Sequence, residues 1–184
     1  MQILSNFIDA NMNISERDKK MLIFSITCIF YDVSKLLLFI VLFALLHRLD
    51  LFLFAFIILL PLRLSSGGLH FKHYMSCLFF SLGYFLLVTI PLTGISIPFW
   101  SAIISLGLCT IINGALSPIL SASRPPLPER EIIHRKKKTL LATSSGILLL
   151  ILFYQTKYFA VGYWTILLHS VQLIIAKLRK KRGE

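Results

Sequence analysis

Long apolar stretches separated by short polar breaks make up most of this chain. The apolar blocks are Met21–Leu46, Leu51–Leu62, Cys77–Thr93, Ile95–Leu116, Leu140–Tyr154 and Tyr158–Ala176. A helix needs about 20 apolar residues to cross the roughly 30 Å of bilayer hydrocarbon, and most of these blocks approach that length. The pattern predicts an all-α fold, a polytopic membrane bundle of about six transmembrane helices. The second block has uncertain boundaries, because its roughly 12 residues span only about 18 Å.

Composition supports the same class of protein. Hydrophobic residues make up 57% of the 184 residues, and the mean hydropathy is +0.80. A soluble domain of this size cannot bury so large an apolar fraction. We therefore expect one membrane-embedded domain over residues 1–184, with membrane lipids as its main surroundings.

The basic residues indicate how the helices are oriented. Lys and Arg near helix ends are retained on the cytoplasmic side. Six crossings put both termini on one side, and sixteen of the nineteen Lys and Arg residues then fall on that side. The predicted topology is N-in and C-in. The net charge of +11 lies in short segments that flank the apolar blocks, so orientation and anionic lipid explain it better than nucleic-acid binding does.

The polar break between the second and third blocks carries the candidate chemistry. It reads RLSSGGLHFKHYMSC, from Arg63 to Cys77. Cys77 stands where this break meets an apolar block, and a thiolate is favoured at a helix N-terminus and beside a histidine. On an unbroken helix His70 would lie about 10.5 Å from Cys77 along the axis, too far for a hydrogen bond. Gly67 and Gly68 allow backbone conformations closed to other residues, so the histidine end can fold back over the cysteine.

The pair His70 and Cys77 is therefore the candidate catalytic dyad, and an ordinary interhelical turn is the alternative interpretation. A metal site is a second alternative, because His70, His73 and Cys77 would share one face of a helix. That set has three ligands and no obvious fourth, so we expect no metal and no cofactor.

Other reactive side chains suit structural roles. Cys28 and Cys109 lie in the middle of apolar blocks, where a thiol behaves as a small hydrophobe. Asp32 is three residues before Lys35, and an internal ion pair explains these two charges more simply than a third catalytic group does. His169 lies within the last block and suggests packing.

A basic, proline-rich loop from Arg124 to Lys138 precedes the fifth block. Its lysines, Lys136, Lys137 and Lys138, are candidates for holding an acidic peptide against the membrane surface by charge. The alternative interpretation is that these lysines only orient the neighbouring helices.

The motif and its position resemble one known family. The residues that carry the resemblance are Arg63, Gly67, Gly68, His70 and Cys77, between the second and third apolar blocks. In their spacing they resemble the accessory gene regulator B (AgrB) family. The resemblance extends to Ser117-Pro118 and to the Pro125-Pro126-Leu127-Pro128 stretch before the lysines. Ser117 and Phe71 depart from the residues expected at those positions.

This resemblance implies a bacterial membrane cysteine endopeptidase that processes a quorum-sensing signal. By analogy, Cys77 attacks a short amphipathic AgrD-type propeptide, His70 transfers the proton, and a thioester acyl-enzyme leads to a thiolactone or lactone ring. Arg63, Gly67, Gly68 and the three lysines would shape the site or bind the substrate, with the active site facing the cytoplasm. A second copy of the chain is a further candidate partner. The alternatives are a small peptide transporter or exporter and a non-enzymatic membrane anchor.

Overall fold

The computed structural model describes residues 16–69, 74–119 and 128–181, and this part of the chain is helical. Its elements are α2 (Glu16–Leu45), α3 (Leu49–Ser66), α4 (Tyr74–Thr89), the 3-10 turn η1 (Leu92–Gly94), α5 (Phe99–Leu116), α6 (Glu129–Leu152) and α7 (Lys157–Lys181). The six α-helices match the six predicted apolar blocks one to one, which confirms the prediction of an all-α membrane helical bundle. The chain divides into two units, residues 1–45 and 46–184.

The described part of the first unit is one long helix, α2. Its 30 residues extend for about 45 Å at 1.5 Å per residue. The Nζ atom of Lys35 lies 3.1 Å from Oδ1 of Asp32, one turn away on the same helix. The predicted ion pair is therefore confirmed, and Asp32 has a structural partner.

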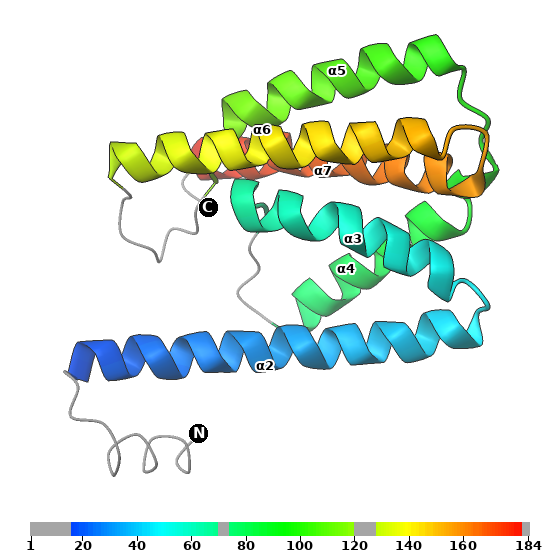
Figure 1. Cartoon of the computed structure of the whole chain (residues 1–184). Coiled ribbons are helices and arrows are strands. Elements are labelled where there is room, and N and C mark those ends of the chain that lie inside the picture. Colours follow the sequence, from blue (N-terminus) through cyan, green and yellow to red (C-terminus); the bar gives the residue numbers. More distant parts are fainter. Residues whose placement is uncertain (1–15, 70–73, 120–127, 182–184) are drawn as a thin grey trace. The chain divides into compact units, whose positions relative to one another are not determined.

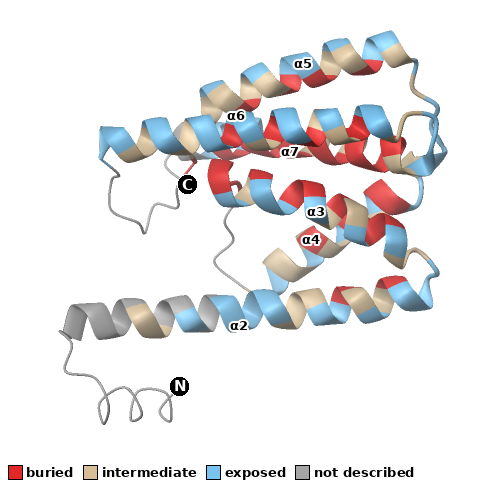
Figure 2. Ribbon diagram, viewed as in Figure 1, coloured by how far each residue is buried: buried red, intermediate tan, exposed pale blue. Residues whose placement is uncertain are grey.

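In the second unit α7 is the central helix, and α3, α4, α5, α6 and η1 all contact it. Figure 1 shows α6 and α7 side by side between α5 and α3. Among the helices apolar enough to cross a membrane, α7 has 67% of its span buried, against 44% or less in the others. The buried residues, red in Figure 2, accordingly lie along α7 and on the face of α3 that packs against it.

The core of this unit joins four helices. It contains Ile58, Leu62, Ala102, Leu106, Cys109, Leu150, Phe159, Tyr163 and Ile166. Gly162 allows close approach at its centre, because a Cβ atom there would overlap the side chain of Leu150 and lie 2.8 Å from Ile58 Cδ1. Small residues allow membrane helices to pack backbone against backbone in this way.

Large apolar side chains cover the outside of the bundle. Leu64, Phe79, Ile104, Leu141 and Leu152 are each more than 60% exposed. Within the described residues, α3, α4 with η1, α5 and α7 are long and apolar enough to cross a membrane. In α6 the charged residues fill the first half, and the apolar half begins after Lys138.

Two helices begin or end at residues that the apolar pattern does not predict. α3 has 18 residues and extends to Ser66, so it is longer than the predicted block. The hydroxyls of Ser65 and Ser66 donate to the helix carbonyls of Pro61 and Leu62 at 2.7 and 2.6 Å, which removes the cost of burying them.

α6 begins at Glu129, so the loop predicted from Arg124 to Lys138 is wrong from that residue onward. The charges themselves support the helix. Glu129 and Glu131 lie in its first turn, where negative side chains are favoured. The guanidinium of Arg135 donates to Glu131 one turn away, at 3.0 Å.

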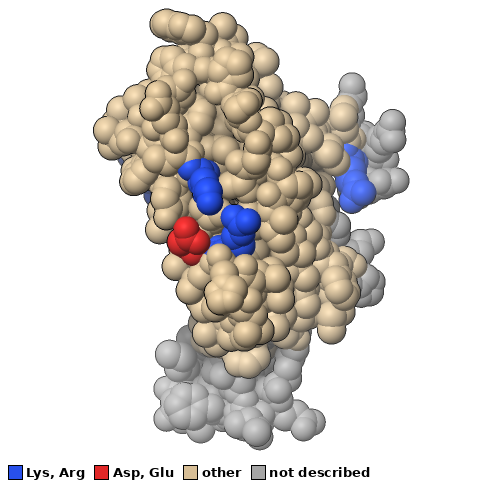
Figure 3. Space-filling model, turned by 90° about the vertical axis from the view of Figure 1, so that its right-hand side faces the viewer, with Lys and Arg blue, Asp and Glu red and all other residues tan. Residues whose placement is uncertain are grey.

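The two ends of the second unit differ in charge. One end gathers the start of α3, the α4–α5 connection and the α6–α7 turn (Figure 1). Figure 3 looks onto this end and shows a largely uncharged surface with few charged side chains. Arg48, Asp50 and Lys157 lie at this end, and the hydroxyl of Tyr158 donates to Asp50 at 3.1 Å. The opposite end carries the end of α3, the beginning of α6 and the end of α7, with most of the basic residues.

Candidate functional site

A strained turn at Gly67 ends α3 and begins the candidate site. Gly67 has φ +79° and ψ −147°, a region that is essentially restricted to glycine. It pairs in parallel with Ile119, whose N–H donates to the carbonyl of Ser66 at 2.8 Å. A Cβ atom at position 67 would overlap the carbonyl oxygen of Ile119. The turn therefore joins the end of α3 to the chain that follows α5, and it requires glycine.

Gly68 differs from its neighbour. Gly67 is the glycine with positive φ among the described residues, and a Cβ at Gly68 would meet no described heavy atom within 4 Å. Gly68 is nonetheless buried. Of the two glycines, only Gly67 therefore has a steric requirement among the described residues.

Ser66 connects this turn to α7. Its Oγ atom lies 2.8 Å from Nε2 of His169, and both side chains are at most 1% exposed. His169, which the sequence suggests for packing, is thus both buried and hydrogen-bonded. A polar side chain within an apolar membrane segment was the available signal, because such residues are commonly functional.

Cys77 lies in the first turn of α4 and is half-buried. Two turns further along α4, the hydroxyl of Tyr84 donates to the carbonyl of Thr165 on α7, at 2.7 Å. α4 is therefore fixed to the central helix on the membrane side of Cys77. His70 and His73 lie outside the described residues, and the predicted pairing of His70 with Cys77 stays a prediction.

Arg63 is in the last turn of α3 and is half-buried. It stands one turn before Gly67, at the end of α3 that leads into the candidate site. A cation there would suit a carboxylate or a developing negative charge.

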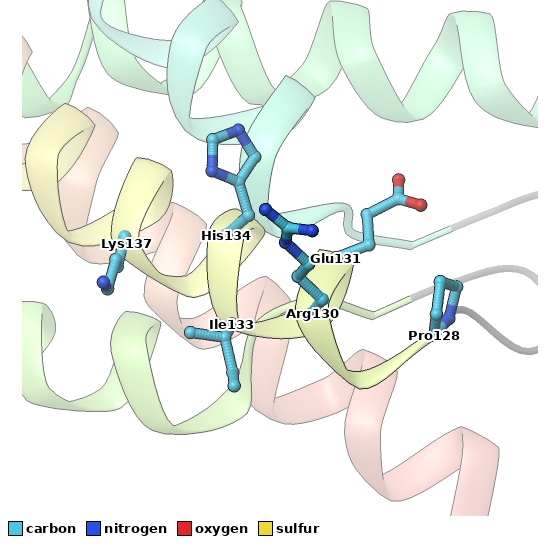
Figure 4. Close-up of a pocket in the computed structure, with 6 residues that line it drawn as sticks. All are labelled: Pro128, Arg130, Glu131, Ile133, His134 and Lys137. Carbon is cyan, nitrogen blue, oxygen red and sulfur yellow. The ribbon is translucent and has the colours of Figure 1, made fainter.

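The three lysines belong to α6 rather than to a loop, and they lie on two different surfaces. Lys137 lines an open depression of about 540 Å³ at the start of α6 (Figure 4). The other residues lining this depression are Pro128, Arg130, Glu131, Ile133 and His134. Figure 4 shows these side chains spread over the outer face of α6, which makes the depression a surface feature rather than an enclosed pocket.

Lys138 lines a groove of about 380 Å³ between α3 and α6. The other lining residues are Pro61, Leu64, Ser65, Leu141, Ala142 and Ser145. Ser65 is two residues before Gly67, so this groove leads toward the candidate site. Lys136 is half-buried. Of the three lysines, Lys138 is the one placed beside the end of α3.

Metal binding has no described geometry to support it. Within residues 16–69, 74–119 and 128–181, no group of three or more His, Cys, Asp or Glu side chains is arranged to hold an ion. Two members of the set His70, His73 and Cys77 lie outside those ranges. Cys109 is 6% exposed in the apolar core, in line with a structural role.

Comparison with known proteins identifies the family. The sequence model of the family Accessory gene regulator B matches residues 1–173. The chain belongs to the accessory gene regulator B family. Over 82 residues it is 34% identical to an AgrB-like protein of Clostridium beijerinckii, a match that covers 45% of this chain and 41% of that protein. No solved structure matches the chain.

Membership in the AgrB family confirms the resemblance based on the glycine pair, the histidine and the cysteine. The family acts in the accessory gene regulator system of quorum sensing and is linked to the processing of its signal peptide. The site described above places two parts of the AgrB-like motif, the Gly67 turn and Cys77, at the same end of the bundle as the basic start of α6.

Proposed function

We propose that this AgrB-family chain is a membrane-embedded cysteine endopeptidase that cuts an AgrD-type propeptide on the carboxy-terminal side of the signal segment. The observation that carries the proposal is the position of Cys77, half-buried in the first turn of an apolar helix. Thiolates are stabilised at helix N-termini, and the thiolate is the reactive form of cysteine. Cys109 provides the contrast, because it is enclosed by apolar side chains.

The proposed reaction follows the pattern of an activated nucleophile. His70 takes the proton of the Cys77 thiol, and the thiolate sulfur attacks the carbonyl carbon of the scissile peptide bond. His70 then gives the proton to the leaving amine as the carbon–nitrogen bond breaks. The carboxy-terminal part of the propeptide departs and leaves a thioester on Cys77. A cysteine thiol within the signal segment then displaces Cys77 and forms a thiolactone, whereas a serine would form a lactone.

We place the active site at the cytoplasmic face of the membrane. The support is the charge difference between the two ends of the second unit, because Lys and Arg are retained on the cytoplasmic side. Arg63, Arg130, Arg135, Lys136, Lys137, Lys138, Lys177 and Arg179 belong to the end that carries Cys77. A site at this surface is open to a cytoplasmic peptide. The surrounding lipid also limits access of water to the thioester.

The start of α6 is the proposed holding site for an acidic propeptide tail. Residues 129–138 contain five basic and two acidic residues, a net charge of +3, and Arg135 is paired with Glu131. We propose that the tail lies against this basic segment and reaches Lys138, where the groove between α3 and α6 begins beside Ser65. From there the scissile bond is directed toward the Gly67 turn and Cys77.

Substitution of the cysteines tests the catalytic part of the proposal. Cys77→Ala and Cys77→Ser are each expected to abolish cleavage of a co-expressed, tagged propeptide, because serine lacks the acidity and nucleophilicity of the thiol. Cys109→Ala is the matched control and is expected to process the propeptide. Mass spectrometry of the peptide products, with immunoblotting of the membrane fraction for protein level, distinguishes lost chemistry from lost protein. Full cleavage by Cys77→Ala would exclude Cys77 as the nucleophile and overturn the proposed mechanism.

A further inference from the structure

Two contacts on α7 hold the chain on either side of Cys77. Before the cysteine, Ser66 bonds to the side chain of His169 at 2.8 Å. After it, the hydroxyl of Tyr84 donates to the carbonyl of Thr165 at 2.7 Å. We propose that His169 is a positioning residue, which acts through Ser66 to fix the turn at Gly67 in front of Cys77. This inference rests on the proposed peptidase function and adds a residue to it.

The two contacts come from one stretch of a single helix. Thr165 and His169 are one turn apart on α7, about 6 Å along the axis. α7 is the most buried membrane helix of the unit, so it is a rigid reference for both contacts. Because α4 is itself continuous from Tyr74 to Thr89, fixing Tyr84 also fixes Cys77 relative to α7. The Ser66 contact then sets where the preceding turn lies relative to that cysteine.

The geometry defines the direction of the hydrogen bonds. The Ser66 hydroxyl has one proton, and its shortest contact to a backbone acceptor is to the carbonyl of Leu62, at 2.6 Å. With that proton directed to Leu62, the tautomer of His169 that fits this contact has its proton on Nε2 and donates to the serine oxygen. The bonds then run in one chain, from His169 through Ser66 to the α3 backbone. Nδ1 of His169 is left as a buried acceptor without a hydrogen-bond partner among the described residues.

The backbone of Ser66 takes part in a second connection. Its carbonyl accepts the N–H of Ile119 at 2.8 Å, next to the paired Gly67. The Ser66 side chain and main chain therefore contact α7 and the chain after α5, respectively. Loss of the His169 bond removes a polar contact of the turn, while Leu69 and Ile119 remain packed against Leu173 of α7. We expect displacement of the turn rather than unfolding of the bundle.

Kinetic measurements on purified protein in lipid nanodiscs test this role. His169→Leu and Ser66→Ala are each expected to lower kcat for propeptide cleavage by about 10- to 100-fold, because small misplacements of reacting groups have effects of that size. KM is expected to change by less than about twofold, since the tail-binding surface on α6 is untouched. His169→Gln is expected to keep kcat within about threefold, because its amide N–H can donate to Ser66. Ser170→Ala is the matched control and is expected to behave as wild type, since Ser170 is the next residue on α7, equally buried, and bonds within its own helix.

The double variant Ser66→Ala with His169→Leu separates positioning from stability. Each single change leaves a buried group unpaired and lowers the unfolding midpoint, whereas replacing both partners by apolar groups can be nearly neutral for stability. We expect the double variant to regain the unfolding midpoint and to keep the low kcat. Recovery of kcat together with stability would show that His169 only packs, and would overturn the proposal. If His169→Leu does not accumulate in the membrane, Tyr84→Phe is measured instead, because Tyr84 makes the second contact with α7. An unchanged kcat in both Tyr84→Phe and Ser66→Ala would also overturn the proposal.

Labelling of Cys77 tests the positioning role of His169 independently of peptidase activity. The rate at which a maleimide labels Cys77, read by peptide mass spectrometry, needs no propeptide. We expect His169→Leu to change that rate by about two- to tenfold, the factor that corresponds to one hydrogen bond, and Ser170→Ala to leave it unchanged. If the wild type does not cleave the propeptide but the labelling difference is present, the proposed function is rejected and the positioning role of His169 still holds. Equal labelling in both variants would reject the positioning contact.

Discussion

Replacing Gly67 by alanine is the sharpest test of the turn in front of Cys77. The backbone at Gly67 has φ +79° and ψ −147°, and the new Cβ would overlap the carbonyl oxygen of Ile119. Alanine must therefore move either α3 or the chain after α5. Movement of either one breaks the bond from Ile119 N–H to the Ser66 carbonyl.

The expected loss of stability has two parts. A non-glycine residue in this backbone region costs about 1–3 kcal/mol. Loss of the bond to Ser66 adds about 0.5–1.5 kcal/mol. The sum is about 1.5–4.5 kcal/mol, and for a protein of this size about 2–4 °C of unfolding midpoint corresponds to each kcal/mol. We therefore expect Gly67→Ala to lower the midpoint by about 3–18 °C.

The assay is thermal unfolding of purified protein in one detergent, followed by circular dichroism at a helix wavelength. Gly68→Ala is the matched control, because Gly68 lacks the positive φ and has open space at its Cβ among the described residues. Its midpoint is expected to stay unchanged or to rise slightly, since alanine reduces the entropy of the unfolded chain. A Gly67→Ala protein that unfolds within about 1 °C of wild type would refute the steric argument.

Three further outcomes are expected. Replacing Lys136, Lys137 and Lys138 together by Gln should raise KM for the propeptide by a modest factor and leave kcat nearly unchanged, because exposed charge pairs are worth about 0–1 kcal/mol each. If the variant and the wild type have the same KM at every salt concentration, these lysines only orient the neighbouring helices. His73→Gln should keep most of the activity, since His70 is the proposed base. Propeptide cleavage by single variants at His70 and His73 measures this, and equal losses at both positions would leave the assignment of His70 as the base without support. Gly162→Val should lower the unfolding midpoint more than Gly68→Ala, because its side chain would overlap Leu150.

The hydrophobic pattern predicted the helices well because lipid leaves few alternatives for an apolar block. It failed where polar residues are helical. Ser65 and Ser66 extend α3 by bonding to their own helix, which the apolar pattern cannot register. The start of α6 is charged and follows several prolines, so composition suggested a loop, although Glu131 and Arg135 stabilise a helix there.

The site could be predicted only as far as its residues lie close together in the sequence. Cys77 was placed at the start of an apolar block, and it lies in the first turn of α4. The difference between Gly67 and Gly68 depends on Ile119, far along the chain, and no local pattern contains that information. The same holds for His169, whose partner Ser66 belongs to another helix. Its solitary position in an apolar segment was the one available signal.

The pairing of Gly67 with Ile119 also sets an order of assembly during synthesis. Ile119 follows α4 and α5 in the chain, and His169 lies in α7, so both partners of the turn are made after Cys77 itself. A growing chain is made from its amino terminus at a few residues per second, and its early helices enter the membrane before the later ones exist. The turn in front of Cys77 can take its final shape only once α5 is in place, and it gains its second support with α7. A ribosome-bound chain that ends before α7 therefore carries the cysteine without its finished surroundings.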